Sequence, residues 1–210
     1  MKPKLLLGLA LVLGGQCFAA IIYPTAPDGG REMVVKYLDS QSLKFLKVSR
    51  AEDLTIAEPF GDYPVTNLMN LSSQNFLSMA QRGAWVYPLM QGTNAVGEMG
   101  LGTDQQSGTG LKFSYLKETG STNTTLEGMR IAEQLPQIKN QDYEFRRLNL
   151  APILFHAVWL HGESDDILIP LPPTFGRWNA YQPYSESQML ALLKPEVEKV
   201  RKAWKPFIPK

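Results

Sequence analysis

The spacing of apolar and polar residues predicts two groups of strands, each preceded by a helix. In the first group a helical pattern covers residues 67–82, and Gly83 follows it as a stop signal. Three strand-like runs come next, at residues 84–90, 95–101 and 111–117, the last after a polar loop at 102–110. Pro88 lies within the first run, and because proline has no backbone N–H we expect that strand at a sheet edge or a bulge.

The second group has the same order. A helical stretch at 125–135 ends at Pro136, and three further strand-like runs follow it, at residues 143–150, 153–161 and 167–171. A helix followed by three strands therefore occurs twice, although the two halves show no sequence match. Runs of strands bracketed by helices, without regular alternation, predict an α+β fold with a mainly antiparallel sheet and helices packed on it.

The two ends of the chain differ from this middle part. Residues 20–31 are predicted to be an extended lead-in ending in a turn, whereas residues 32–48 fit either a helical face or two strands. At the other end Ser185 and Gln188 form a capping box for a short helix, and Pro195 suits the first turn of another. We therefore predict an accessory segment at 20–66, a core domain at 67–184 and C-terminal helices at 185–210.

The predicted strand 153–161 is apolar on both of its faces. Its residues alternate between two sets, Ile153, Phe155, Ala157 and Trp159 on one side and Leu154, His156, Val158 and Leu160 on the other. A strand of this kind is normally covered on both faces, which predicts His156 as a buried, hydrogen-bonded core residue. A partner subunit could supply one of the two covers, so a homo-oligomer is an alternative.

The first nineteen residues have the layout of a secretory signal peptide. A basic start at residues 1–4 precedes an apolar run at 5–13, which is too short to span a bilayer core of about 30 Å. Small residues then predict cleavage after Ala19. We expect an exported protein, periplasmic or secreted. The alternative is a lipoprotein attached through Cys17, which fits less well because Gln16 precedes the cysteine.

Composition excludes several classes of function for the mature chain. Removal of residues 1–19 takes away the only cysteine and leaves 19 basic against 20 acidic side chains, a formal charge of −1. Thiol chemistry and a general attraction to nucleic acid are therefore not expected. We find no dinucleotide fingerprint and no phosphate-binding loop, and we expect no cofactor. After residue 19 no apolar run reaches the length of a transmembrane segment.

An aromatic, proline-rich loop at 170–184 is the first candidate binding site. Aromatic residues recur every third position there, with an arginine among them: Phe175, Arg177, Trp178, Tyr181 and Tyr184. On an extended path with about three residues per turn, this spacing places the rings along one edge. Such an edge suits a sugar, a peptide or a protein surface. The alternative is that the rings pack down over the sheet as a cover.

A polar turn that begins at His161 is the second candidate. His156 and His161 are five positions apart, so a strand sends them to opposite faces and they are not expected to share a metal or form a dyad. His161 is close in sequence to Glu163, Asp165 and Asp166, and with one of them it could act as a general base. The alternative is a solvated turn. These acidic residues lack the spacing of a calcium loop, and we predict no metal site.

These observations favour one class of function over another. The absence of a catalytic motif and the presence of the aromatic loop favour a non-catalytic exported domain that binds a protein, a peptide or a cell-envelope component. The alternative is a hydrolase or lyase that uses His161 with the acidic residues of the 163–166 turn.

Overall fold

The computed structural model describes residues 20–65, 76–103 and 110–204. The predicted signal peptide and its Cys17 lie outside these residues, as do most of the predicted helix 67–82 and most of the polar loop 102–110. The predicted repetition of a helix followed by three strands therefore stays a prediction.

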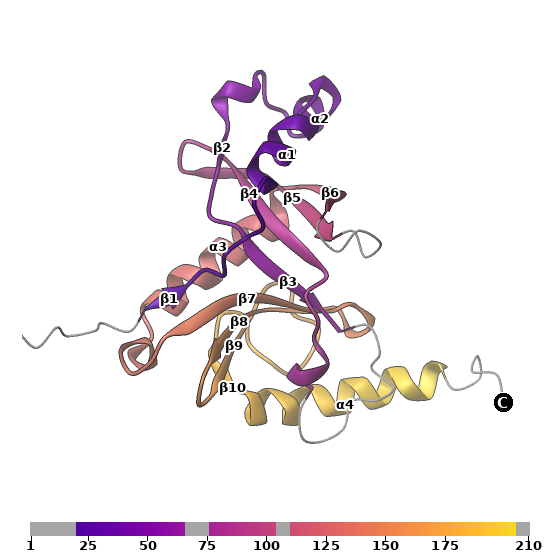
Figure 1. Ribbon diagram of the computed structural model, residues 1–210. Coiled ribbons are helices and arrows are strands. Elements are labelled where there is room, and N and C mark those ends of the chain that lie inside the picture. The colour runs from indigo at the N-terminus through magenta and orange to yellow at the C-terminus, as the bar shows by residue number, and fades with distance from the viewer. Residues whose placement is uncertain (1–19, 66–75, 104–109, 205–210) are drawn as a thin grey trace, which may run out of the picture.

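A ten-stranded, mostly antiparallel sheet organises the described part of the chain, and four α-helices pack on it (Figure 1). The strands are β1 (Ile21–Ile22), β2 (Thr55–Ile56), β3 (Phe60–Pro64), β4 (Ala84–Gln91), β5 (Asn94–Thr103), β6 (Leu111–Glu118), β7 (Tyr143–Leu150), β8 (Phe155–Gly162), β9 (Asp166–Pro170) and β10 (Tyr184–Ser185). The helices are α1 (Gly30–Tyr37), α2 (Ser40–Phe45), α3 (Gly120–Glu133) and α4 (Glu186–Trp204). The predicted α+β class is confirmed.

The sheet joins two antiparallel groups of strands at one parallel pair. Its order is β10-β9-β8-β7-β3-β4-β5-β6, with β1 beside β7 and β2 beside β4. The groups β7–β10 and β3–β6 meet where β3 runs parallel to β7. Residues 20–65 supply β1, β2 and β3, so the predicted accessory segment shares its sheet with the predicted core domain.

All six strands predicted from alternation are present, as β4 to β9. Pro88, however, is not at an edge, because β4 has neighbours on both sides. On one side β4 pairs first with β3 and then with β2, and Pro88 falls between these two ladders, where its carbonyl accepts a hydrogen bond from the Ala57 N–H at 3.0 Å. A register irregularity follows between Leu89 and Met90. The predicted edge position of the strand that contains Pro88 was wrong. The alternative that was predicted, a bulge, corresponds to the register irregularity just after the proline.

The described end of the first predicted helix is not an α-helix. Leu77–Met79 form a single 3-10 turn, η3. Phe76 and Leu77 are buried in the core, and Gly83, expected to end a helix, donates its N–H to the Asp62 carbonyl at 2.9 Å as β4 begins. Burial of the Phe76 and Leu77 side chains and the hydrogen bond between Gly83 and β3 outweigh the helical preference that the sequence pattern indicates.

Residues 32–48, which the sequence left undecided, lie largely in helices α1 and α2. The Asp39 side chain caps α2 by accepting a hydrogen bond from the Ser42 N–H at 2.8 Å. Lys47, at a φ of 58°, turns the chain away after this helix. Val34 is fully buried, and the two helices cover the end of the sheet formed by β4, β5 and β6 (Figure 1).

The C-terminal segment forms one helix where two were predicted. The capping box is confirmed: Ser185 N–H donates to Gln188 Oε1 at 2.9 Å, and Gln188 N–H donates to Ser185 Oγ at 3.3 Å. Pro195 lies inside α4 and does not start a second helix. Its missing N–H would have paired with the carbonyl of Ala191, which is exposed, so water can satisfy that carbonyl.

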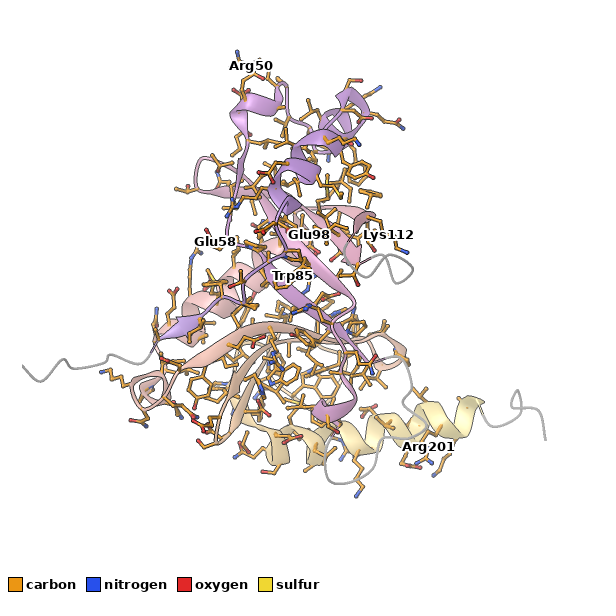
Figure 2. The ribbon with its side chains drawn as sticks, viewed as in Figure 1. Arg50, Glu58, Trp85, Glu98, Lys112 and Arg201 are labelled. Carbon is orange, nitrogen blue, oxygen red and sulfur yellow. The ribbon has the colours of Figure 1, made fainter. Side chains whose placement is uncertain are left out.

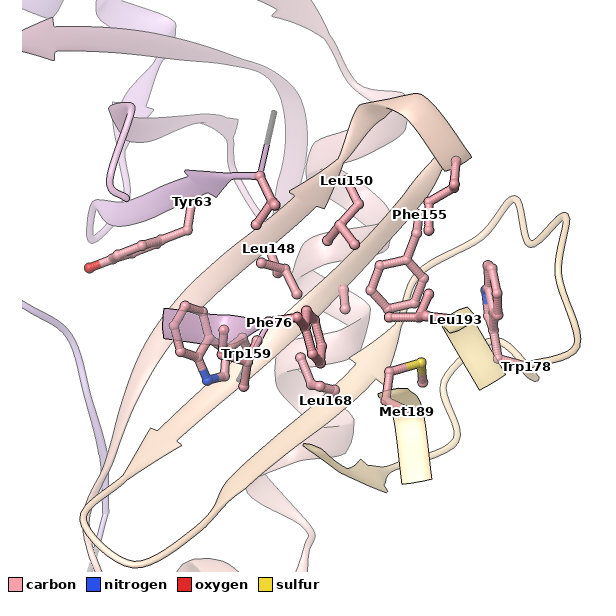
Figure 3. Close-up of a cluster of buried hydrophobic side chains, with 14 of the residues drawn as sticks. Tyr63, Phe76, Leu148, Leu150, Phe155, Trp159, Leu168, Trp178, Met189 and Leu193 are labelled. Atoms are coloured by element: carbon pink, nitrogen blue, oxygen red, sulfur yellow. The ribbon is translucent and has the colours of Figure 1, made fainter. Parts of the chain in front are cut away.

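Strand β8 is covered on both faces, as predicted. Phe155, Ala157 and Trp159 pack under α4 in one hydrophobic cluster, whereas Val158 and Leu160 pack under α3 in another (Figure 3 shows the first). Both covers come from the same chain. The burial of β8 therefore gives no argument for a partner subunit.

Candidate functional site

A cavity of about 500 Å³ opens between the first turns of α3, strands β7 and β8, and the segment after β9. We call it the α3 pocket. One wall is apolar and contains Leu171 with Pro172 and Pro173, which are joined by a cis peptide bond. The remaining lining residues are Lys117, Gly120, Ser121, Thr124, Thr125, Arg147, Asn149 and His156.

The pairing of β7 with β8 brings three polar side chains into this pocket. Arg147 and Asn149 are two positions apart on β7 and therefore share a face of the sheet. His156 is the cross-strand partner of Asn149 on β8. Strand alternation thus presents a guanidinium, a carboxamide and an imidazole to one cavity.

Arg147 is the centre of a buried network of charges. Its Nε donates to Asp62 Oδ1 at 2.8 Å, and its Nη1 and Nη2 donate to the two carboxylate oxygens of Glu98 at 2.8 and 3.0 Å. Nη2 also donates to the Tyr115 hydroxyl at 3.0 Å. The Glu98 side chain is fully buried, and Figure 2 shows it in the interior, whereas Arg50 and Arg201 lie at the periphery. One N–H on Nη1 has no partner among the described residues.

The network stabilises the ionised form of Glu98. Burial alone would raise the pKa of this carboxyl, but the charge and hydrogen bonds of Arg147, helped by Lys117 and Thr122, hold the pKa below its ordinary value. Burial raises the pKa of Tyr115, so that its hydroxyl keeps its proton. Two basic side chains, Arg147 and Lys117, thus balance the carboxylates Asp62 and Glu98 beside the pocket.

His156 and Asn149 are two polar groups of the pocket wall, and His156 differs from its predicted place in the core. His156 is half-buried on the cavity wall and not enclosed in the core, and burial, followed by the charge of Arg147, lowers its pKa. The imidazole is therefore neutral near neutral pH. The Asn149 side-chain oxygen is buried and accepts no hydrogen bond within the part of the chain that the structure describes.

Glycines of β5 make room for the network. A Cβ atom at Gly100 would overlap the ring of Tyr115, and one at Gly97 would overlap Leu46 and the Lys117 backbone. These glycines allow the close packing of β5 against its neighbours.

The second candidate cluster is only partly brought together. His161 Nδ1 lies 2.8 Å from Asp166 Oδ1. Asp165 faces elsewhere, since it accepts hydrogen bonds from the Tyr143 hydroxyl at 2.7 Å and from Gln141. Glu163 is exposed at the tip of the turn. Within the described residues no group of three His, Cys, Asp or Glu side chains is arranged to hold a metal ion.

The aromatic loop does not bring its rings to one edge. Trp178 is 3% exposed and packs edge-on against Phe155, with ring centroids 5.1 Å apart. Tyr184 packs on the same side, whereas Tyr181 packs against the cluster under α3. Phe175 is 65% exposed, and Arg177 is exposed as well. Three of the four rings thus contribute to packing.

Sequence reasoning missed the charged residues of the network. Asp62, Glu98 and Arg147 come from three strands, and their contacts join residues 49 and 85 positions apart. One signal was present: Arg146 and Arg147 are adjacent in a predicted strand, so one of them had to face the interior.

A comparison with protein-family models finds no match for this chain, and comparisons with curated proteins and with solved structures find none either. Among the helices of the described segments, none has both the length and the apolar character needed to cross a membrane.

Proposed function

We propose that this protein binds, in its α3 pocket, a small molecule with an apolar body and one polar, preferably anionic, end. The observation that carries the proposal is the pocket itself: a cavity of about 500 Å³ with an apolar wall and three convergent polar groups. Mostly apolar cavities with a few placed polar groups are the usual form of small-molecule sites.

The apolar body would lie against Leu171, Pro172 and Pro173. Contact with these side chains removes apolar surface from water, which contributes about 25 cal/mol for each Å² buried. The wall carries no charge, so it does not discriminate between ligands of similar shape. Specificity would come from the polar side.

The polar end would lie beside the first turn of α3. The N-cap residue Thr119 makes no side-chain hydrogen bond to this turn, and Gly120 and Ser121 line the pocket. Uncapped N–H groups at a helix start favour a negative group. Within the described residues one N–H of Arg147 has no partner, and together with the ammonium of Lys117 it adds donors.

The test is binding of 8-anilinonaphthalene-1-sulfonate, which combines apolar rings with one anionic group. We expect saturable fluorescence enhancement with the folded protein. Ser121→Trp fills the pocket entrance and should weaken binding at least tenfold. Asn123→Trp adds the same side chain on an exposed position of the same helix outside the pocket and should leave binding unchanged. Equal affinity of both variants would refute the pocket as the binding site.

The exported location predicted from residues 1–19 is part of this proposal. So is the expected partner, a protein, a peptide or a cell-envelope component that would supply or receive the ligand. Among the five candidate residues of the aromatic loop, Phe175 and Arg177 remain exposed for such a contact.

A further inference from the structure

A second cavity, of about 360 Å³, lies on the other face of the sheet from the α3 pocket, where the β8–β9 hairpin meets the start of α4. We call it the hairpin cleft. Its charged and aromatic lining consists of Arg146, Trp159, His161, Asp166 and Glu186. Arg146 lies next to Arg147 on β7, and adjacent strand residues face opposite sides, so the two cavities are independent.

The cleft holds a histidine in a fixed orientation. His161 and Asp166 are cross-strand partners, and Nδ1 of the imidazole lies 2.8 Å from Asp166 Oδ1. The same oxygen accepts a hydrogen bond from Trp159 Nε1 at 2.8 Å. In the tautomer that donates Nδ1–H to this carboxylate oxygen, the lone pair lies on Nε2. The His161 side chain is 41% exposed, whereas Asp166 is 17% exposed. A carboxylate-oriented imidazole of this kind can act as a general base.

Glu186 supplies the complementary group. It is the first residue of α4 and half-buried in the cleft. Burial, and then the negative charge of Asp166, raise the pKa of its carboxyl, while a hydrogen bond from the Leu77 backbone opposes the shift. A carboxyl group with a raised pKa retains its proton more readily and can act as a general acid.

Arg146 provides the positive charge of the cleft. Its Nε and Nη2 donate to the two oxygens of Glu144 at 2.8 and 3.1 Å, and its guanidinium stacks on the rings of Tyr63 and Trp159. The N–H groups on Nη1 make none of these hydrogen bonds. Within the described part of the chain they have no hydrogen-bond partner, so they can donate to an oxygen atom that becomes negative in a transition state.

We propose that the hairpin cleft hydrolyses uncharged carboxylic esters, with His161 as general base toward water and Glu186 as general acid toward the leaving oxygen. Water is the nucleophile. Its oxygen bonds to the acyl carbon while its proton moves to His161 Nε2, and the negative carbonyl oxygen is stabilised by Arg146. The bond from the acyl carbon to the alkoxy oxygen then breaks, and that oxygen takes the proton of Glu186. Acid and alcohol leave, and the proton on His161 restores Glu186 through solvent.

The charges of the cleft select the substrate class. With Glu186 protonated as the general acid, the two carboxylates Asp166 and Glu144 still outnumber the single cation Arg146. A phosphate ester would bring further negative charge to this site, whereas a carboxylic ester is neutral and develops one negative oxygen only in the transition state. We therefore assign uncharged carboxylic esters.

The test compares two esters of the same acid, p-nitrophenyl butyrate and ethyl butyrate. His161→Gln should lower kcat/KM for both by about 100-fold, the range of general base catalysis. Glu186→Gln should slow ethyl butyrate by about tenfold or more but p-nitrophenyl butyrate by less than about threefold, because p-nitrophenolate leaves without a proton. Glu133→Gln, an exposed glutamate on α3, should change neither rate.

Two further measurements separate chemistry from folding. Added imidazole should restore part of the rate to His161→Gly, which requires an intact cleft. Asp166→Asn should lower both rates and, in nitrogen NMR spectra, shift His161 away from the Nδ1-protonated tautomer, because Asp166 acts as a positioning residue. The proposal is overturned if wild-type protein hydrolyses neither ester faster than buffer, if His161→Gln keeps the wild-type rate, or if Glu186→Gln slows both esters equally.

Discussion

Arg147 on β7 donates two hydrogen bonds to Glu98 on β5, although β3 and β4 lie between these strands in the sheet. Neighbouring strands are about 4.8 Å apart, so strands three places apart in a flat sheet are separated by about 14 Å. Two long side chains, and the twist of the sheet, bridge this distance. The contact links the two antiparallel groups of strands, and Asp62 on β3, the strand beside β7, also accepts a hydrogen bond from Arg147.

Loss of the central cation should destabilise the whole fold. Arg147→Met leaves Glu98 and Asp62 buried without their partner, and we expect the free energy of unfolding to fall by about 3–5 kcal/mol. Urea denaturation followed by circular dichroism measures this loss. Arg130→Met is the control, because Arg130 is exposed and its pair with Glu127 contributes about 1 kcal/mol at most. Similar losses for the two variants would contradict a structural role for the network.

The same network predicts a pH dependence of stability. The folded-state pKa of Glu98 is lowered, because Arg147 outweighs the opposing effect of burial. Folding therefore favours the ionised carboxylate. This contribution is fully present above the ordinary pKa of 4.5 and is lost as the pH falls through the lower folded-state value. Urea midpoints measured across this acid range should fall for the wild type and fall less steeply for Glu98→Gln. Parallel curves would exclude Glu98 as a source of the dependence.

The aromatic loop gives a matched pair of substitutions. Trp178→Ala removes a ring packed on Phe155 in the core, and we expect a loss of about 3–5 kcal/mol. Phe175→Ala removes an exposed ring and should change stability by about 0.5 kcal/mol or less. Figure 3 shows Trp178 at the end of the cluster away from Tyr63. Thermal unfolding of both variants measures the difference, and a stable Trp178→Ala protein would restore the binding interpretation of this residue.

Two glycines of β5 give a second matched pair. A methyl group at Gly100 would overlap the Tyr115 ring, and displacement of that ring also disturbs Arg147. We expect Gly100→Ala to cost about 1–3 kcal/mol. At Gly102 the nearest atom to an added Cβ is a backbone oxygen 3.7 Å away, so Gly102→Ala should be close to neutral. Chemical denaturation of the two variants under one set of conditions tests this, and equal costs would exclude the Tyr115 contact as the cause.

Sequence patterns predicted those parts of the fold that depend on local chemistry. The six strands β4 to β9 follow from alternation, and the capping box of Ser185 and Gln188 follows from two side chains three positions apart. Sequence patterns failed where contacts between distant parts of the chain determine the local structure. The described end of the helical pattern at 67–82 is a 3-10 turn, and Phe76 and Leu77 at its start are buried in the core. Pro88 lies inside the sheet because two short partner strands leave a gap beside it.

The candidate sites were likewise predicted where their residues are close in sequence and missed where they are not. His161 was grouped with Glu163, Asp165 and Asp166 because all four lie close together in sequence, and the structure pairs His161 with Asp166 at 2.8 Å. The network around Arg147 was not predicted, because its partners lie far away in sequence. Glu186 in the hairpin cleft was not predicted either, since its role depends on how α4 docks against the hairpin. Such pairings require the tertiary fold.

The parallel pairing of β3 with β7 has a consequence for how the chain folds. Gly61 on β3 is aligned with Arg146 on β7, 85 positions later, so this contact closes a long loop. Closing a loop of that length costs more chain entropy than forming a hairpin, and contacts between distant residues slow folding. The hairpins β4–β5 and β7–β8 need only local closure. The two antiparallel halves can therefore form early, and their junction at β3 and β7 is expected to be the slow event in the assembly of this sheet.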